Sequence, residues 1–470
     1  MHQTEQNIRR RHELELAGPF VVVLAVLTLI AFIIPLRPET SMREKRRLHE
    51  FPAFSVDALL SGEYFDGISL WFSDTFPGRE TLLEVSDRID ALHGLNRNEV
   101  VLTQTAQNDN ADLDALLAEA EAAAAAREAE APAQPAVTQA QTPAPAAAPT
   151  PEPTPEPVAD QNEVIEQWAG LNGEDEASIY GDLVVIDGTI MSRLGFDQTA
   201  SDHHAALMNQ AGNALAAKGI RFFNLPAPTS VGVMMSSELM AEMGSADQGK
   251  TLRYMFAQEN DNVGKVNAFN NLLAHNSEYI YFNTDHHWTA LGAYYAYQAF
   301  CETAGFEPVP LSEFTEWNMG EFVGTYTYSV SSRNLKKDEV IALVPPDNED
   351  IHMEVIGYPA YTRVIVDETE AQPNMKYNCF IAGDNQLTTI TNDRLPDAPD
   401  CLVIKDSFGN PFVVYLAEHY HHVYVLDYRK NFTAVSTVAE QYGVQDVILV
   451  QSVGVSQTRQ ALPLLDNLMK

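Results

Sequence analysis

The sequence predicts an α/β fold with a doubly wound, mostly parallel sheet, and two features near the C-terminus support this prediction. The apolar runs CLVIKD, HVYVLDY and DVILVQ alternate with the helix-like segments PFVVYLAEHY and TAVSTVAEQYG. The runs are also continuously apolar, which is typical of parallel strands that helices cover on both faces. Because β-α-β connections are right-handed, we expect these segments to form successive crossovers in one sheet.

Similar patterns extend over residues 163–470, which we expect to form one globular domain. Short apolar runs predict strands at 183–187, 220–225, 278–282, 401–406, 422–428 and 446–451. Helical periodicity predicts helices at 202–218, 262–275, 289–303, 411–420 and 432–442.

Four shorter segments precede this domain. Residues 17–36 are about twenty residues without a charge, enough to cross a bilayer as a helix. No signal-peptidase site follows, so we expect an uncleaved anchor behind a cytoplasmic tail at residues 1–16. Residues 37–102 mix aromatic and acidic residues and are predicted to form a folded juxtamembrane segment. Residues 103–162, an Ala/Glu tract and then a Pro-rich stretch, are predicted to be a linker.

Composition excludes some classes of function. The chain has 65 acidic and 29 basic residues and a net charge of -36, which argues against a nucleic-acid-binding protein. Its three cysteines are too few for a disulfide framework. Basic residues flank the apolar run at 17–36 on both sides. If orientation depended only on placing the more basic flank in the cytoplasm, the large domain would stay in the cytoplasm.

Ser407, in the string VIKDSFGNPF, is a candidate nucleophile. An apolar strand is expected to end just before it, and a helix to begin at Pro411 with Asn410 as its cap. The serine would then lie at the carboxyl end of a parallel strand, where open α/β sheets bind ligands. Serines are also common in such turns as local hydrogen-bonding groups, so this position alone leaves both roles open.

The string NTDHHW supplies the groups that a serine nucleophile needs. Asp285 and His287 are two residues apart, so in extended backbone their side chains would point to the same side. The carboxylate would then orient the imidazole, whose other nitrogen would face the serine. On this interpretation His286 points away and has a structural role, and Trp288 forms a wall of the site.

Metal binding is the competing interpretation of these histidines. Asp285, His286 and His287 are all ligand types, and the pairs His203-His204 and His421-His422 add more. However, the sequence has no His-x-x-x-His helix spacing, and we interpret the two pairs as surface or cap residues. We therefore expect neither a metal nor another cofactor.

Three strings together, YIYFNTDHHWTALGAYYAY, GTYTYSVS and VIKDSFGNPFVVYLAEHYHHVYVLDYR, resemble the DHHW family. That family is related to the alginate O-acetyltransferases, which have an SGNH-hydrolase-like domain. The resemblance implies a circularly permuted SGNH-like fold for residues 163–470. It assigns Asp285, His287 and Ser407 as a catalytic triad and the backbone N–H of Ser407 as an oxyanion donor.

The resemblance also implies a pathway for the acetyl group. A membrane-bound O-acyltransferase (MBOAT) partner would deliver the acetyl group to the outer face of the membrane. Ser407 would carry it as an ester and pass it to a hydroxyl of a secreted polysaccharide, which places the domain outside the cytoplasm. Two alternatives stay open: an acetyl esterase with the same triad, and a non-catalytic scaffold of a polysaccharide export complex.

The remaining oxyanion donors are harder to assign. SGNH proteins carry a Gly and an Asn where this chain has Tyr428-Arg429 and Gln451. Arg429 or Gln451 would be the substitutes, as would Gly383 or Asn385 in the string IAGDNQ. Each of these residues also has a purely structural interpretation, such as a helix cap or a loop hydrogen bond.

Overall fold

The computed structural model describes part of the chain. The described residues are 112–130, 178–330, 334–346, 348–358, 360–361, 363–430, 433–459 and 461–468, together with short pieces between residues 40 and 76. In those pieces β1 (Thr40–Ser41) pairs with β2 (Arg46–Arg47). None of the described helices is both long and apolar enough to cross a bilayer. The predicted tail at 1–16 and the anchor at 17–36 lie outside the described residues.

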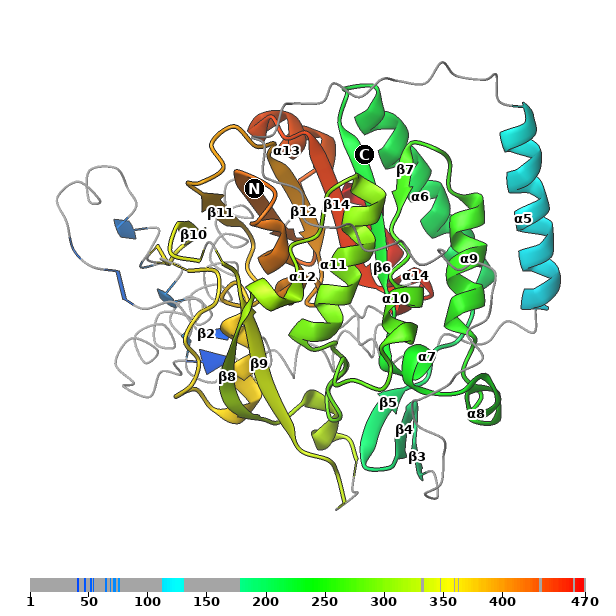
Figure 1. Ribbon diagram of the computed structural model, residues 1–470, viewed down its shortest axis with the longest axis horizontal. Helices are drawn as coiled ribbons and strands as arrows, with labels where there is room; N and C mark the ends of the chain where they lie inside the picture. The colour runs from blue at the N-terminus through cyan, green and yellow to red at the C-terminus, as the bar shows by residue number, and fades with distance from the viewer. Residues whose placement is uncertain are drawn as a thin grey trace, which may run out of the picture.

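A mixed sheet organises the described domain, with strand order β10-β11-β13-β12-β14-β6-β7 (Figure 1). The parallel strands are β7 (Val263–Lys265), β6 (Arg221–Ala227), β14 (Asp446–Ser452), β12 (Cys401–Lys405) and β13 (His422–Asp427). The strands β11 (Thr388–Asn392) and β10 (Ile351–Val355) continue the sheet in antiparallel pairing. The predicted α/β class is therefore confirmed, and β12, which precedes Ser407, lies in the middle of the sheet.

Helices cover both faces of this sheet. One face is covered by α6 (Gln198–Ala216), α13 (Val435–Tyr442) and α15 (Leu462–Leu468), the other by α11 (Ala290–Ala304) and α12 (Gly409–Leu416). Successive residues of β12 point to opposite faces of the sheet, and each face packs against its own hydrophobic core. Leu402 and Ile404 pack with the α6 side, whereas Val403 packs with the α11 side. Each such side chain is fully buried and contributes about 1.5–3 kcal/mol.

Smaller elements surround the sheet. The described ones are α7 (Ser230–Met234), α8 (Ser237–Glu242), α9 (Gln248–Gln258), α10 (Phe269–Ala274), α14 (Val453–Ser456), η1 (Leu311–Glu313), η2 (Thr325–Tyr328) and η3 (Pro373–Cys379). A three-stranded sheet contains β3 (Ser178–Tyr180), β4 (Leu183–Ile186) and β5 (Thr189–Ser192). An antiparallel pair is formed by β8 (Thr315–Phe322) and β9 (Asp338–Val344).

Two predicted elements are wrong. The segment 278–282 is not a strand, although it is apolar; only an isolated bridge joins Tyr281 to Trp288. It is apolar because Ile280 and Phe282 are buried in the core by side chains, and its backbone is paired in a local turn. The predicted helix at 262–275 is instead β7 followed by α10, and sequence periodicity does not separate such short buried elements.

The Ala/Glu tract is part of the folded structure. Residues Leu113–Glu130 form α5, which lies along α9 at the edge of the molecule (Figure 1). Leu117 is buried against Tyr254, and two exposed ion pairs also join α5 to α9. Within the range 103–162 this stretch is therefore a packed helix and not a free spacer. The rest of that range lies outside the described residues, so the linker boundaries stay a prediction.

Candidate active site

The turn that carries Ser407 connects β12 to α12. The Asp406 carboxylate fixes this turn by accepting hydrogen bonds from the backbone N–H of Phe408, at 3.0 Å, and of Ser452, at 2.8 Å. Burial raises the pKa of this carboxyl. The expected cap is not formed, because α12 begins at Gly409 and the Asn410 side chain donates to Asp384 instead. The sequence correctly places the serine at the strand end, but a carboxylate one residue earlier holds its turn.

The DHHW loop is a tight bend and not an extended segment. Residues 283–287 are bent, and the Tyr281–Trp288 bridge closes the base of the loop. The Trp288 indole is fully buried and its Nε1–H donates to the Phe408 carbonyl at 2.9 Å. Trp288 also packs edge-on against Phe408, with ring centroids 5.3 Å apart, and its role as a wall of the site stays a prediction. Trp288 ties the loop to the turn that carries the serine.

Asp285, His287 and Ser407 form a continuous series of hydrogen bonds. The distance from Asp285 Oδ1 to His287 Nδ1 is 2.5 Å, and from His287 Nε2 to Ser407 Oγ it is 2.7 Å. Because a carboxylate only accepts hydrogen bonds, Nδ1 carries the proton and Nε2 accepts from the hydroxyl. Asp285 is fully buried, and the exposed fractions of His287 and Ser407 are 2% and 8%. The structure thus brings together two loops that are separated by 120 residues.

The second oxygen of Asp285 is also occupied. It accepts hydrogen bonds from the backbone N–H and the hydroxyl of Thr325, both at 2.8 Å. The preceding Gly324 allows this contact, because a Cβ at that position would overlap the Thr284 backbone. Both carboxylate oxygens are therefore held in place, and the carboxylate orients the imidazole without rotating.

Asp338 supports the same loop from β9. One of its carboxylate oxygens accepts from the backbone N–H and the hydroxyl of Thr284, at 2.8 and 2.5 Å. The other accepts from the Asn283 backbone and side chain and from the Tyr279 hydroxyl, at 2.7, 3.0 and 2.7 Å. Asp338 is 1% exposed. Its five hydrogen bonds fix the two residues that precede Asp285.

Two rings enclose the His287 imidazole. Tyr377 stacks on it with ring centroids 4.2 Å apart, and its hydroxyl donates to the Ser407 carbonyl at 2.9 Å. The His286 ring also packs against it, with ring centroids 3.8 Å apart, and His286 Nδ1 is 3.4 Å from Asp285 Oδ1. The expectation that His286 points away is wrong, because the backbone is bent here and adjacent side chains do not alternate.

An ionic cluster occupies the neighbouring strand ends. Arg429 pairs with Asp427 at 2.6 Å and with Asp384 at 2.7 Å, and the buried Lys405 also pairs with Asp384 at 2.7 Å. Burial would raise the pKa of Asp384, but Arg429 and Lys405 hold it well below its usual range. The Arg429 guanidinium is thus balanced by two carboxylates, and in this arrangement it fixes the Asp384 loop to β13.

The other residues predicted as oxyanion donors contact neighbouring parts of the protein. Gln451 is fully buried and its amide contacts His204 of α6, on the sheet face opposite α11. Tyr428 is buried in the core on that same face. The Asn385 side chain donates to the carbonyls of Ala382 and Gly383, within its own loop.

The loop that carries Gly383 has an unusual backbone. Ile381, Ala382 and Gly383 have φ angles of 47°, 58° and 79°. Left-handed conformation is rare for a β-branched residue such as isoleucine, and strain of this kind is often found next to functional sites. The strained turn directs the next residue, Asp384, toward Lys405 and Arg429.

The remaining donor beside the serine is its own backbone. Among the described residues, the N–H of Ser407 has no hydrogen-bond acceptor, whereas the next three backbone N–H groups are all paired. An unpaired N–H at the start of a helix is suited to a developing negative charge. This agrees with the donor that the resemblance implies.

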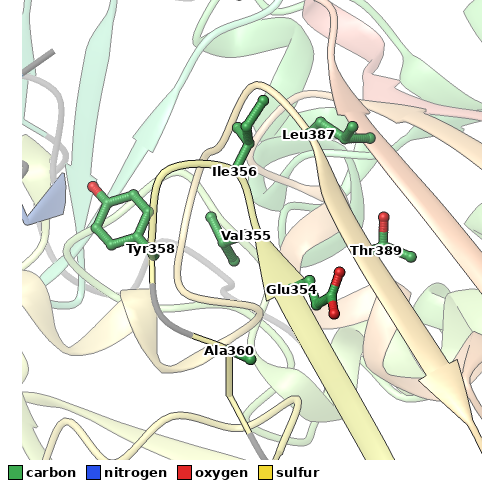
Figure 2. A pocket seen from close by; sticks show the side chains of 7 residues that line it. All are labelled: Glu354, Val355, Ile356, Tyr358, Ala360, Leu387 and Thr389. Carbon is green, nitrogen blue, oxygen red and sulfur yellow. The ribbon is translucent and has the colours of Figure 1, made fainter. Parts of the chain in front are cut away.

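A shallow pocket of about 410 Å³ lies at the ends of β10 and β11 (Figure 2). It is lined by Glu354, Val355, Ile356, Tyr358, Ala360, Leu387 and Thr389. None of the hydrogen-bonded triad residues lines it. In the sheet, β11 is two strands from β12 and β10 is three strands from it, so this pocket is separate from the serine.

Sequence reasoning missed three residues of this arrangement: Thr325, Asp338 and Tyr377. Thr325 lies in the string GTYTYSVS, which contributed to the family resemblance but received no role. Asp338 and Tyr377 had no local signal, because the first precedes an ordinary apolar run and the second lies in the short 3-10 helix η3.

The fold and the family of the chain are supported by comparison with known proteins. A family model described as DHHW protein matches residues 44–141 and 150–426. A DHHW family protein from Eubacterium siraeum is 23% identical with a TM-score of 0.56, and the match covers 63% of this chain and 99% of that chain. PatB1 of Bacillus cereus, in a structure with a sulfonyl adduct, is 16% identical with a TM-score of 0.50, covering 61% and 98%.

The O-acetyltransferase domain of Pseudomonas putida AlgJ is also matched. It is 13% identical with a TM-score of 0.36, and the match covers 61% of this chain and 98% of that chain. No curated protein matches the chain. At such identities, the E. siraeum and B. cereus structures establish a shared α/β mixed-sheet fold.

Proposed function

This chain belongs to the DHHW family, and from that premise we propose that it is a serine-dependent O-acetyltransferase that modifies a polysaccharide outside the cytoplasm. The observation that carries the proposal is the hydrogen-bonded series from Asp285 through His287 to Ser407, with distances of 2.5 and 2.7 Å. This is the arrangement by which a base activates a serine hydroxyl and an acid orients the base.

The chemistry proceeds in two transfers. In the first, Ser407 Oγ attacks the acetyl carbonyl while His287 Nε2 takes the hydroxyl proton. The bond to the donor alcohol breaks, and His287 returns the proton to that alcohol, which leaves an acetyl ester on the serine. In the second, a sugar hydroxyl attacks this ester and gives its proton to His287, which passes it to Ser407 as the ester bond breaks.

The backbone N–H of Ser407 is the proposed donor to the oxyanion in both transfers. It has no acceptor among the described residues, and it lies at the N-terminal end of α12. A single preorganised donor of this kind contributes about 3–4 kcal/mol to stabilising the transition state. A second donor is needed for the usual pair, and the paired Arg429 is not free to supply it without breaking an ion pair.

The near-complete burial of the site limits access to the serine from solution. Ser407 is 8% exposed, and Tyr377 and Phe408 lie against the His287 ring at centroid distances of 4.2 and 5.2 Å. Transfer therefore requires that a bound sugar hydroxyl take the place of water next to the acetyl ester. An acetyl esterase would use the same triad with water as the acceptor.

The donor, the acceptor and the location belong to the same proposal. An acetyl-loaded serine outside the cytoplasm needs a membrane partner that brings acetyl groups across, and a membrane-bound O-acyltransferase would fill this role. The apolar run at 17–36 would hold the domain at the membrane. The acceptor would be a hydroxyl of a secreted or cell-surface polysaccharide.

The first experiment tests the triad. Purified protein is assayed with p-nitrophenyl acetate, and we expect Ser407→Ala and His287→Ala each to lower kcat by roughly 10⁴-fold or more. Ser237→Ala and His203→Ala are the matched controls, because both residues are exposed and outside the site. Wild-type cleavage that Ser407→Ala retains would refute the proposed nucleophile.

The second experiment separates the three classes of function. Intact-mass measurement after incubation with the acetyl ester should show one acetyl group on wild type and none on Ser407→Ala. Added oligosaccharide should then receive the acetyl group faster than water does. Release only to water would identify an esterase. A protein that is neither acetylated nor labelled at Ser407 by a sulfonyl fluoride would be a scaffold.

A further inference from the structure

A second cluster of chemically reactive side chains lies at the opposite end of the sheet from Ser407. Asp400 precedes β12, and His421 and His422 lie at the start of β13. Each offers one potential ligand atom, and the three atoms lie within 4.8 Å of one another. β12 and the turn span about six residues between the cluster and Ser407, or roughly 20 Å, so the two sites are separate.

The distances within this cluster suit a small metal ion. Asp400 Oδ1 lies 2.9 Å from His422 Nδ1 and 3.9 Å from His421 Nδ1. A tetrahedral ion with bonds of about 2.0–2.1 Å separates its ligands by roughly 3.3–3.4 Å. The two Asp400–histidine distances bracket this value, and all three ligand atoms lie within 4.8 Å of one another, so small side-chain movements would bring them to coordination distance.

The backbone holds these three residues in place before any ion binds. The backbone N–H of His422 donates to Asp400 Oδ1 at 2.9 Å, and that of His421 donates to the Pro399 carbonyl at 3.0 Å. Gln445 fixes Asp400 from the other side, by accepting from its N–H at 2.8 Å and donating to its carbonyl at 3.0 Å. Such preorganisation lowers the entropic cost of binding.

The cluster is accessible to ions from solution. The exposed fractions of the Asp400, His421 and His422 side chains are 23%, 25% and 28%. Among the described ion pairs, Asp400 has no lysine or arginine partner, and its close contacts in that set are with the two imidazoles. This differs from the catalytic cluster, in which Asp285 is enclosed and His287 is committed to Ser407.

We propose that Asp400, His421 and His422 bind one divalent transition-metal ion, with Zn²⁺ as the best fit. Two imidazoles and one carboxylate are ligands that suit Zn²⁺, whereas Ca²⁺ and Mg²⁺ require oxygen ligands. Three protein ligands leave a fourth position for water. The ion would tie the start of β12 to the start of β13, and so would brace the β-α-β unit that carries the serine.

The test is a zinc titration of the full-length, chelator-stripped protein without an affinity tag. Equilibrium dialysis against ZnCl₂ should show one tight site in wild type. We expect its affinity to fall by roughly 100-fold or more in His422→Ala and in Asp400→Asn, since loss of a ligand costs at least as much as loss of a supporting residue. Zinc should also raise the Tm of wild type but not that of His422→Ala.

His352→Ala is the matched control. His352 is half-exposed on the same sheet and pairs with Asp393 at 2.8 Å, and within the described part of the chain this histidine–aspartate pair has no third ligand. This variant should bind zinc like wild type. The proposal is overturned if wild type takes up no more zinc than the His421→Ala/His422→Ala double variant. It is equally overturned if the bound ion is lost in His287→Ala and kept in the double variant.

Discussion

Asp338→Asn is the sharpest test of how the catalytic loop is held. The wild-type carboxylate accepts five hydrogen bonds, two on one oxygen and three on the other. The variant keeps the size of the side chain but replaces one oxygen with an NH₂ group, which cannot accept. At least two hydrogen bonds to Asn283 or Thr284 are then lost, and their donors face another donor.

The size of the effect follows from those lost bonds. Hydrogen bonds to a charged group contribute about 1.5–3 kcal/mol each, so losing two should cost about 3–6 kcal/mol of unfolding free energy. The loop that carries Asp285 and His287 is the part directly affected. A displacement of about 1 Å at the imidazole lowers kcat by roughly 100-fold. We expect kcat to fall with little change in KM, because the residue is buried and touches no substrate.

The assay combines urea unfolding, followed by circular dichroism, with p-nitrophenyl acetate kinetics at low urea. The matched control is Glu339→Gln, the next residue on β9, whose side chain is exposed and contacts Asn318. Glu339→Gln should change neither measurement. If Asp338→Asn unfolds at the wild-type urea midpoint and retains wild-type kcat, the proposed support of the loop is wrong.

Two further predictions concern the same framework, and a third concerns Glu259, a buried carboxyl at the end of α9 that accepts a hydrogen bond from the Asn224 side chain of β6 at 2.7 Å. Asp285→Asn should lower kcat by about 10⁴-fold, because the amide favours the wrong tautomer of His287; a pH–rate profile and kcat that match wild type would refute this role. Gly324→Ala should cost about 1–3 kcal/mol in thermal unfolding and lower kcat, since its Cβ overlaps the Thr284 backbone; an unchanged Tm would contradict the close packing. Burial raises the pKa of Glu259 from 4.5 to about 8, so the folded protein holds an extra proton between these values. This contribution to stability is complete below pH 4.5 and falls by about 1.4 kcal/mol per pH unit as the pH rises toward 8. Glu259→Gln should remove this loss, so its unfolding free energy relative to wild type should rise across that range; parallel pH profiles would show that the carboxyl titrates normally.

The sequence alone determined the features that depend on local burial. The apolar runs that become β6, β12 and β14 were predicted because those strands are buried on both faces, and continuous burial leaves a continuous pattern; in β13, His422 and Tyr424 are only partly buried. The same logic placed Ser407 after a strand end, whereas Asp285 and His287 were paired on the premise of an extended backbone, and the loop is in fact bent. The apolar pattern wrongly predicted a strand at 278–282, where the apolar residues are buried in a turn and not in a sheet.

Only the tertiary structure decided which groups meet across long separations in the chain. The 2.7 Å contact between His287 and Ser407 arises because β12 lies in the middle of the sheet and the DHHW loop folds over its end. Asp338 and Tyr377 reach the site from elements that have no motif of their own. Local periodicity reports whether a residue is buried, and it holds no information about which distant residue lies opposite, because strand order and loop packing set that contact.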